Sequence, residues 1–483
     1  MNALKLFVNK PTAIAVTAIV FFLVNIVSRF PGFPNLDSNL QYNEAVSGHF
    51  SDWQPPIMAW LWSGLRLILD GTGLLFSLQV IFYWFGFGLI AITLSRIGRG
   101  FAAWAVIAVA LLPPFLMLNI QILKDVGLAV TFLSSFAIIF WYRSQSKRVS
   151  PPAATFAIVL LLYGSLVRAN AVFAVPPLLI YIFYPQLLFR PIRFLAACFI
   201  VITIMIPASN LFNHAILHAK AAHPLQSLEI FDIAGIAHFS NDMSVFGDER
   251  LTKNLLSECY TPVLWDTLNG KNCHVFLDSL GPQSEEKWIS AIIRHPLAYA
   301  EHRITHFCSE LNSFLLIHHS KDSVYDWTVY IHVQPVTLKE KIYDYMRFCA
   351  IFTPCFSLVL GCVVLTLAFR GAVKNPSSLE NAAFCLAVSG LFYLLAYLLI
   401  GVASDFRYQY WDMIAIFVAS VICMSEKRNC FLPLSGGGAA FIGILSVALV
   451  IVQIAQLIER NTQFPSGVEI DERTKQKITE PKS

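Results

Sequence analysis

The sequence predicts an all-α protein that crosses a membrane many times. Of its 483 residues, 56% are hydrophobic and only 13% are charged, whereas soluble domains are about 45–50% apolar and about 25% charged. The mean hydropathy is +0.62. The apolar residues also gather in runs close to the roughly 20 residues that a helix needs to cross a bilayer. These observations exclude an ordinary soluble protein.

The apolar runs predict eleven membrane-spanning helices. The first lacks the small-residue cleavage site of a secretory signal peptide, so we expect it to be retained as an anchor. In chain order the eleven segments are 11–28, 74–95, 101–119, 125–142, 152–167, 170–187, 193–212, 345–369, 380–402, 408–424 and 437–458.

Basic residues predict the orientation of these helices. They cluster at every second boundary, and short loops rich in Lys and Arg stay in the cytoplasm. The six clusters are Lys5/Lys10, Arg96/Arg99, Arg143/Lys147/Arg148, Arg190/Arg193, Arg370/Lys374 and Lys427/Arg428. The links around Lys124, Arg168 and Arg407 then lie outside. The outside here is the periplasm if the chain belongs to the inner membrane of a bacterium.

This topology predicts four parts. Residues 1–212 form a seven-span module whose first outer loop covers 29–73. Residues 213–344 form an extracytoplasmic domain of mixed, mostly helical structure. Residues 345–458 form the C-terminal transmembrane helices, and 459–483 form a polar tail.

The first outer loop carries three acids in the stretch DSNLQYNEAVSGHFSDWQPPIMAWLW, residues 37–62: Asp37, Glu44 and Asp52. The segment 39–48 is expected to form a short helix on the membrane, with Tyr42 and Ala45 on its inner face. Interfacial aromatics and an extended Pro-Pro elbow follow. Two interpretations stand: an aromatic belt with solvated acids, or a functional site.

Four further charges lie near the membrane boundary. Lys124 and Asp125 open a span with almost no polar loop before it, so they face protein or a cavity, either as a neutralising pair or as a site. Arg168 interrupts two apolar runs, and Arg407 opens a span beside Tyr408. Arginine matches phosphate oxygens, so these cations predict a phosphate site, with snorkelling anchors as the alternative.

The outer domain adds two weaker patterns. His302 and His306 have the i, i+4 spacing that a metal can use, but a polar face that helps an acceptor glycan to dock is the stronger interpretation. Cys259 and Cys273 are compatible with a disulfide in an oxidising periplasm, whereas the third thiol of this domain, Cys308, leaves an odd number. Both the bonded and the reduced state remain open.

The first outer loop resembles that of the GT-C membrane glycosyltransferases of the aminoarabinose-transferase and protein O-mannosyltransferase type. Their pattern runs roughly D-E-x-x-Y-x-x-x-A, then G-D-W, then K-P-P-L and a Trp. The matching residues here are Asp37, Tyr42, Glu44, Ala45, Gly48, Asp52, Trp53, Pro55, Pro56 and Trp60. A seven-span front module followed by a soluble outer domain is a further point of similarity.

The resemblance implies an inverting glycosyltransferase that moves a sugar from a polyprenyl-phosphate donor to an acceptor glycan, lipid or protein outside the cytoplasm, such as lipopolysaccharide. It implies Asp37 as the general base or orienting group and Asp125 as a second acid. Lys124, Arg168 and Arg407 become contacts of the donor phosphate, with Tyr42, Glu44, Asp52 and Tyr408 as further substrate contacts. No cofactor is implied with certainty, since the use of a divalent metal varies within the family.

Two departures and two alternatives accompany this expectation. The second acid of the motif is Ser38 here, and the lysine before Pro-Pro is Gln54, so an aminoarabinose transferase itself is not expected. A flippase or transporter of lipid-linked glycans would use charges along a translocation path. A non-enzymatic assembly factor would leave the acids without a role. The net charge is +4. Its basic residues lie mostly in the loops that set the topology and form no basic patch, so no nucleic-acid partner is predicted.

Overall fold

The computed structural model describes residues 10–270, 272–311, 350–372 and 377–426. The predicted span 437–458, the tail 459–483 and the end of the predicted outer domain from 312 lie outside these residues. The described chain divides into two compact units. The first, here called the membrane unit, comprises the residues up to Ala222, 350–395 and from Arg407 onward. The second comprises 223–311 with 396–406 and is called the outer unit after the location that the sequence predicts for it.

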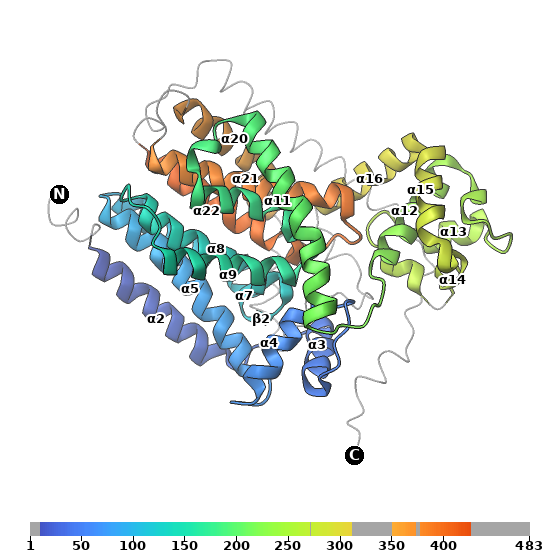
Figure 1. Ribbon diagram of the computed structural model, residues 1–483, viewed down its shortest axis with the longest axis horizontal. Coiled ribbons are helices and arrows are strands. Elements are labelled where there is room, and N and C mark those ends of the chain that lie inside the picture. Colours follow the sequence, from blue (N-terminus) through green and yellow to red (C-terminus); the bar gives the residue numbers. More distant parts are fainter. Residues whose placement is uncertain (1–9, 271, 312–349, 373–376, 427–483) are drawn as a thin grey trace. The chain divides into compact units, whose positions relative to one another are not determined.

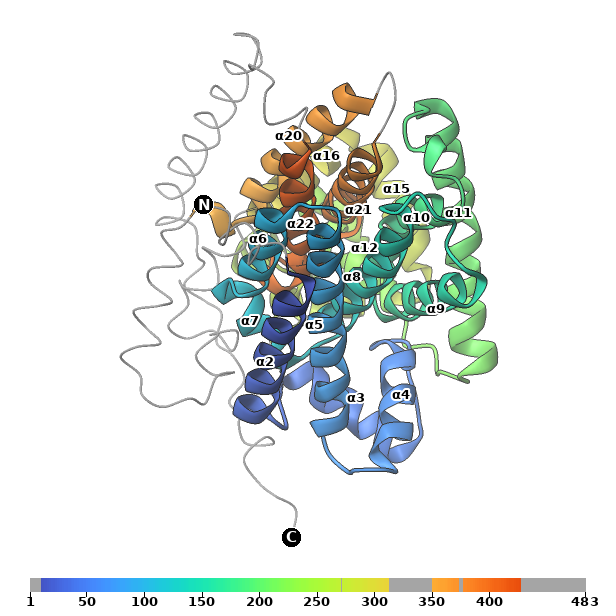
Figure 2. The same ribbon diagram turned by 90° about the vertical axis from the view of Figure 1, so that its left-hand side faces the viewer.

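The membrane unit is a bundle of apolar helices (Figure 1). α2 (Pro11–Arg29), α5 (Gly73–Arg96) and α8 (Lys124–Arg143) pack side by side, as both ribbon views show (Figure 2). α8 is buried along most of its length, from Asp125 to Phe140. The other apolar helices of the unit include α9 (Pro151–Val167), α10 (Val175–Phe183), α11 (Pro191–Leu211), α20 (Pro354–Ala372), α22 (Tyr410–Ser425) and α21 (Ser378–Ile400), whose residues 396–400 belong to the outer unit.

Six helices in the described residues are long and apolar enough to cross a membrane, so the chain is a helical membrane protein. They are Pro11–Arg29, Gly73–Arg96, Lys124–Arg143, Pro191–Ile216, Ser378–Ile400 and Phe406–Ser425. The predicted spans 152–167, 170–187 and 345–369 coincide with shorter apolar helices, of 10–17 residues by the same measure. The predicted count of eleven is therefore met only in part.

The predicted span 101–119 is not one straight helix. It consists of α6 (Gly100–Ala110) and α7 (Pro113–Asn119), which meet at an angle of 56°. Pro113 and Pro114 occupy the first turn of α7. Proline lacks an N–H to continue the preceding helix and disfavours helical geometry in the residue before it, so the break follows directly from the sequence.

The first outer loop folds into two short helices, α3 (Leu36–Ser47) and α4 (Pro56–Arg66). The side chain of Asn35 caps α3 by accepting a hydrogen bond from the Ser38 amide at 2.8 Å. Gly48 ends the helix with φ of 68°, a left-handed conformation that glycine adopts without strain. The predicted helix over 39–48 is thus present and starts three residues earlier.

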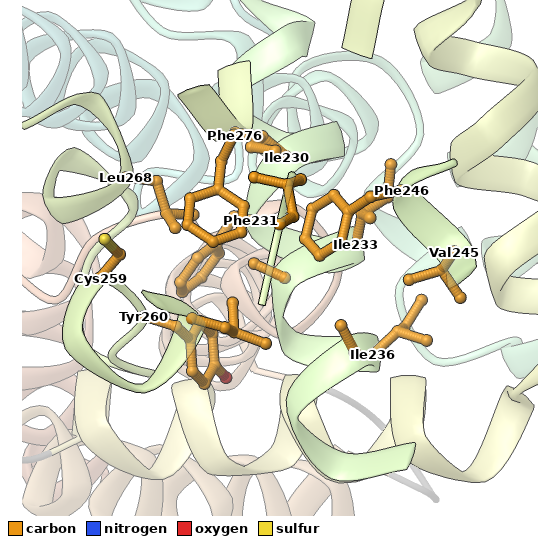
Figure 3. Packing of buried hydrophobic residues seen from close by; sticks show 14 of the residues in the cluster. Ile230, Phe231, Ile233, Ile236, Val245, Phe246, Cys259, Tyr260, Leu268 and Phe276 are labelled. Atoms are coloured by element: carbon orange, nitrogen blue, oxygen red, sulfur yellow. The ribbon is translucent and has the colours of Figure 1, made fainter. Parts of the chain in front are cut away.

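The outer unit is built on α12 (Leu225–Ser240), α15 (Ser284–Arg294) and α16 (Pro296–Leu311), with shorter α13 (Lys253–Cys259) and α14 (Val275–Leu280). Ile230, Phe231 and Ile233 of α12 lie in its hydrophobic core, together with Phe246 and Phe276 (Figure 3). A disulfide joins Cys259 to Cys273, the bonded state of the two that the sequence left open.

The segment 401–406 belongs to the outer unit although it is distant in sequence. Ala403 forms an antiparallel bridge with Leu264, and the Val402 carbonyl accepts from the Trp265 amide at 2.8 Å. The Arg303 guanidinium donates to the Gly401 carbonyl at 2.6 Å. These contacts tie the link between α21 and α22 into the outer unit.

Candidate functional site

A short parallel strand pair places the first outer loop beside the start of α8. β1 (Phe33–Pro34) pairs with β2 (Gln121–Ile122), and the Phe33 amide donates to the Ile120 carbonyl at 3.1 Å. The Ser38 hydroxyl donates to the Ile122 carbonyl. Ser38, which departs from the acid of the motif, therefore fastens α3 to the strand that leads into Lys124.

Asp37, in the first turn of α3, forms an ion pair with Arg407. Its carboxylate Oδ2 lies 2.9 Å from Nη1 of Arg407, which stands in the 3₁₀ turn η8 (Phe406–Gln409) before α22. Burial disfavours the charged form of Asp37, but the positive charges of Lys124, Arg407 and Arg168 and the hydrogen bond from Arg407 outweigh it. The pKa of Asp37 is consequently lowered from its ordinary value.

Gln54 joins Asp37 to Lys124. Its amide Nε2 donates to Oδ1 of Asp37 at 3.3 Å, and its Oε1 accepts from Nζ of Lys124 at 2.9 Å. Gln41 of α3 donates to the same Oε1 at 3.2 Å. Gln54 is 5% exposed, so each of its polar atoms depends on these partners. Sequence reasoning treated this residue only as a missing lysine.

Asp125 and Arg168 form a second ion pair, with 3.2 Å between Oδ1 and Nε. Asp125 is 1% exposed. α9 ends at Val167, and the backbone of Arg168, the next residue, is extended, with φ of −145°. Its guanidinium lies 4.2 Å from the ring centre of Tyr408, and that of Arg407 lies 5.2 Å from the same ring. Tyr408 thus links the two ion pairs.

The structure therefore brings six of the residues singled out in the sequence into one connected cluster, the charge cluster: Asp37, Lys124, Asp125, Arg168, Arg407 and Tyr408. Its five ionisable groups other than Tyr408 are three cations and two carboxylates. An excess of one positive charge in a largely buried place favours the approach of an anion. Lys124 beside Asp125 is not a simple neutralising pair, since Asp125 pairs with Arg168.

Three other predicted site residues bind groups that are not part of the charge cluster. Tyr42 donates to Asp70 at 3.0 Å and packs on the Trp62 ring. Glu44 accepts from the amide and the hydroxyl of Ser51 at 3.1 and 2.6 Å, and burial nevertheless raises its pKa. These contacts shape the loop. The structure does not bring Tyr42, Glu44 or Asp52 into the charge cluster.

Asp52 binds the chain segment that follows α11. Its Oδ1 accepts from the Ala222 amide at 2.5 Å, and its Oδ2 lies 3.4 Å from Nε2 of His214. It therefore connects the first outer loop to the end of the seventh predicted span, and it does so within the membrane unit.

The expected polar docking face on α16 is wrong, because its basic residues point inward. His302, Arg303 and His306 are 0%, 3% and 0% exposed. Asp232 of α12 forms an ion pair with Arg303, and its Oδ1 lies 3.2 Å from Nε2 of His302. The Tyr260 hydroxyl lies 2.8 Å from Nδ1 of His302. These side chains are buried beside a carboxylate, so they belong to the interior of the outer unit and do not form a surface for a ligand.

The two i, i+4 histidines each contact a neighbouring group of the outer unit. Nδ1 of His306 lies 2.8 Å from the Pro262 carbonyl, a contact that uses one ring nitrogen. Within the described ranges, no group of three or more His, Cys, Asp or Glu side chains is arranged to hold a metal ion.

Comparison of the chain with models of protein families, with curated proteins and with solved structures finds no match.

Proposed function

We propose that this chain is an integral membrane glycosyltransferase of GT-C architecture, with about eleven spans and its site on the periplasmic face of a bacterial inner membrane. It moves a sugar from a polyprenyl-phosphate donor to an acceptor glycan, lipid or protein. The support is the first-loop motif together with the charge cluster, in which the motif acid Asp37 pairs with Arg407 and also lies in the positive field of Lys124 and Arg168.

The pairing of Asp37 with Arg407 at 2.9 Å is the observation that carries the proposal. An inverting transfer needs a carboxylate that takes the proton of the attacking hydroxyl, and cations that stabilise the departing phosphate. The oxygen of the acceptor forms its bond to the anomeric carbon while the bond from that carbon to the phosphate oxygen breaks. The phosphate leaves with the electron pair, and the hydroxyl proton passes to Asp37.

Arg407 couples these two events. In the described structure it neutralises Asp37, which lowers the pKa of that carboxyl and makes it a weak base. A donor phosphate beside Arg407, Lys124 and Arg168 offsets part of the positive charge that acts on Asp37. The pKa of Asp37 then rises toward the range in which it accepts a proton, so donor binding activates the base.

The test is transfer of radiolabelled sugar by the purified protein in lipid nanodiscs. Undecaprenyl-phosphate sugars serve as donors, and a cell-envelope extract supplies acceptors. Asp37→Asn keeps the size of the side chain but removes the base, and we expect a loss of at least about 100-fold. Asp70→Asn is the matched control, since Asp70 lies on the same loop with a side chain that is 69% exposed.

Transfer by wild-type protein that persists unchanged in Asp37→Asn contradicts the mechanism. Absence of transfer with every donor, by protein that is folded, contradicts the assignment as a glycosyltransferase and favours the assembly-factor alternative.

A further inference from the structure

A second candidate site lies at the other end of α3 from Asp37. It is built where the chain leaves α11 and returns to the first outer loop. α11 passes into a π-helical turn, η3 (Phe212–Ile216), and such turns occur frequently at functional sites. The Lys220 amide then donates to the Phe50 carbonyl at 2.9 Å, and the Asp52 amide donates to the Lys220 carbonyl at 3.0 Å.

These contacts border an open pocket of about 390 Å³, here called the loop cavity. This volume lies in the range of small-molecule sites. Its walls come from the first outer loop, from α4 and from the segment after η3. Its lining includes the basic residues His49, His218 and Lys220 and the aromatic Trp60.

The loop cavity combines basic groups with an exposed aromatic ring. Lys220, His49 and His218 are all exposed, and the eight residues that line the cavity include no acid. Trp60 is 51% exposed. An ammonium group and two imidazoles that can donate hydrogen bonds suit an anion. The electron-rich face of an indole suits the C–H groups on one face of a sugar ring.

The backbone at His218 supports a shaped site. Its φ is 52°, a left-handed conformation that is uncommon for residues other than glycine and costs about 1–3 kcal/mol. Asp52 keeps this segment in place through Ala222 and His214. The acid that the sequence suggested as a substrate contact is therefore a positioning residue for the cavity wall.

The same helix connects the loop cavity to the charge cluster. Asp37 begins α3 and Gly48, which lines the cavity, ends it. Eleven residues at 1.5 Å per residue separate their Cα atoms by about 16 Å. An acceptor held in the cavity can therefore reach Asp37 with a different part of its structure.

We propose that the loop cavity binds a sugar that carries a phosphate monoester, with Trp60 against the ring and Lys220, His49 and His218 around the phosphate. As part of the proposed transferase, this group is the headgroup of the acceptor. The reacting hydroxyl is on a different part of the same acceptor and lies toward Asp37, so one acceptor occupies both ends of α3. The role as an acceptor site rests on the proposed function, whereas binding of the phosphosugar does not.

The test measures binding by saturation-transfer NMR to the full chain in phosphatidylcholine nanodiscs. Glucose 6-phosphate is the probe, because its phosphate is not on the anomeric carbon and it does not mimic the donor. Glucose and inorganic phosphate are the partial probes. We expect Lys220→Ala to weaken glucose 6-phosphate about tenfold or more, since a hydrogen bond to a charged group is lost. Trp60→Leu is expected to weaken glucose 6-phosphate and glucose several-fold and to leave phosphate unchanged.

Matched controls separate the two sites. Lys253→Ala removes an exposed lysine at the start of α13 and is expected to bind like wild type. Binding is measured without a donor and does not depend on sugar transfer, which makes failure of the transferase proposal distinguishable from failure of this one. Octyl glucoside 6-phosphate serves as the lipid-anchored probe. Tighter binding of this probe than of glucose 6-phosphate assigns the ligand to a membrane lipid, and equal binding assigns it to a soluble phosphosugar.

Two results overturn the inference. One is a failure of the binding expected for glucose 6-phosphate: either wild type does not bind it detectably, or wild type, Lys220→Ala and Trp60→Leu bind it equally. The other is inorganic phosphate that binds as tightly as glucose 6-phosphate, because the cavity would then recognise an anion without its ring.

Discussion

At the scale of single residues, the charge cluster depends on side chains whose partners come from distant parts of the chain. Arg168 reaches Asp125 across 43 positions of sequence, and Asp37 reaches Arg407 across 370. Gln54 shows how the chemistry changes with the partner. Its neutral amide donates to a carboxylate and accepts from an ammonium, which a lysine at this position is unable to do because it has no acceptor.

The Asp125–Arg168 pair gives a prediction at this scale. Arg168→Met removes the cation and leaves Asp125, which is 1% exposed, without its ion-pair partner. Loss of one partner of a buried pair costs about 3–5 kcal/mol, although the side chain of Arg168 is 13% exposed and water reduces this cost. We expect a clearly lower midpoint of thermal unfolding in detergent.

The double variant Arg168→Met/Asp125→Asn is the control for that prediction. Removal of both charges is expected to restore part of the lost stability, because no unpaired charge remains. A double variant that is less stable than Arg168→Met would show that Asp125 is stabilised by other groups.

At the scale of elements, close packing of α12 on α16 determines where the buried histidines lie. A Cβ atom added to Gly235 of α12 would lie 2.2 Å from the ring of His302. No other residue leaves room for that ring. The predicted polar face failed for this reason: α16 carries an arginine and two histidines, but His302 fills the space that Gly235 provides.

Gly235→Ala is therefore expected to destabilise the outer unit by about 1–3 kcal/mol through overpacking. Hydrogen exchange measured by mass spectrometry should show faster exchange in peptides from α12 and α16. Gly64→Ala in α4 is the control, since nothing lies within 4 Å of its Cβ position and alanine favours a helix. Unchanged exchange in α12 and α16 of Gly235→Ala would mean that His302 moves aside at little cost.

At the scale of the whole molecule, buried histidines make the outer unit sensitive to acid. The outer unit buries two neutral histidines. Burial lowers the pKa of His302, although the nearby Asp232 opposes this. Burial also lowers the pKa of His306 to about 3, and the positive charge of Arg303 adds to the effect. A histidine whose pKa is depressed on folding stabilises the fold above its unfolded value near 6.5. That stability is lost as the pH falls toward the folded value.

We therefore expect the outer unit to lose about 2 kcal/mol from His306 alone between pH 7 and pH 5, at about 1.4 kcal/mol for each unit of pKa difference. Hydrogen exchange in the outer unit, corrected for the intrinsic pH dependence, measures this loss. His306→Asn keeps a donor for the Pro262 carbonyl but does not titrate, so its stability should depend less on pH. An equal pH dependence in this variant would exclude His306 as the cause.

The sequence by itself determined the class of the molecule and most of its elements. Apolar runs identify membrane helices because a bilayer offers backbone groups no partners outside the helix. The prolines at 113 and 114 explain the bend between α6 and α7, although the apolar run 101–119 was predicted as one span. The same reasoning singled out Asp37, Lys124, Asp125, Arg168 and Arg407, since charges near hydrocarbon need a partner or a role.

Only the tertiary structure decided which of these charges meet. Pairing depends on the β1–β2 contact and on where α9 ends, and no local pattern encodes distances between segments hundreds of residues apart. It also joined Asp52 to the segment that lines the loop cavity, through Ala222 and His214, and it put the α16 histidines inside the outer unit. Residue type predicts that a charge must be satisfied, whereas the packing of helices selects the partner that satisfies it.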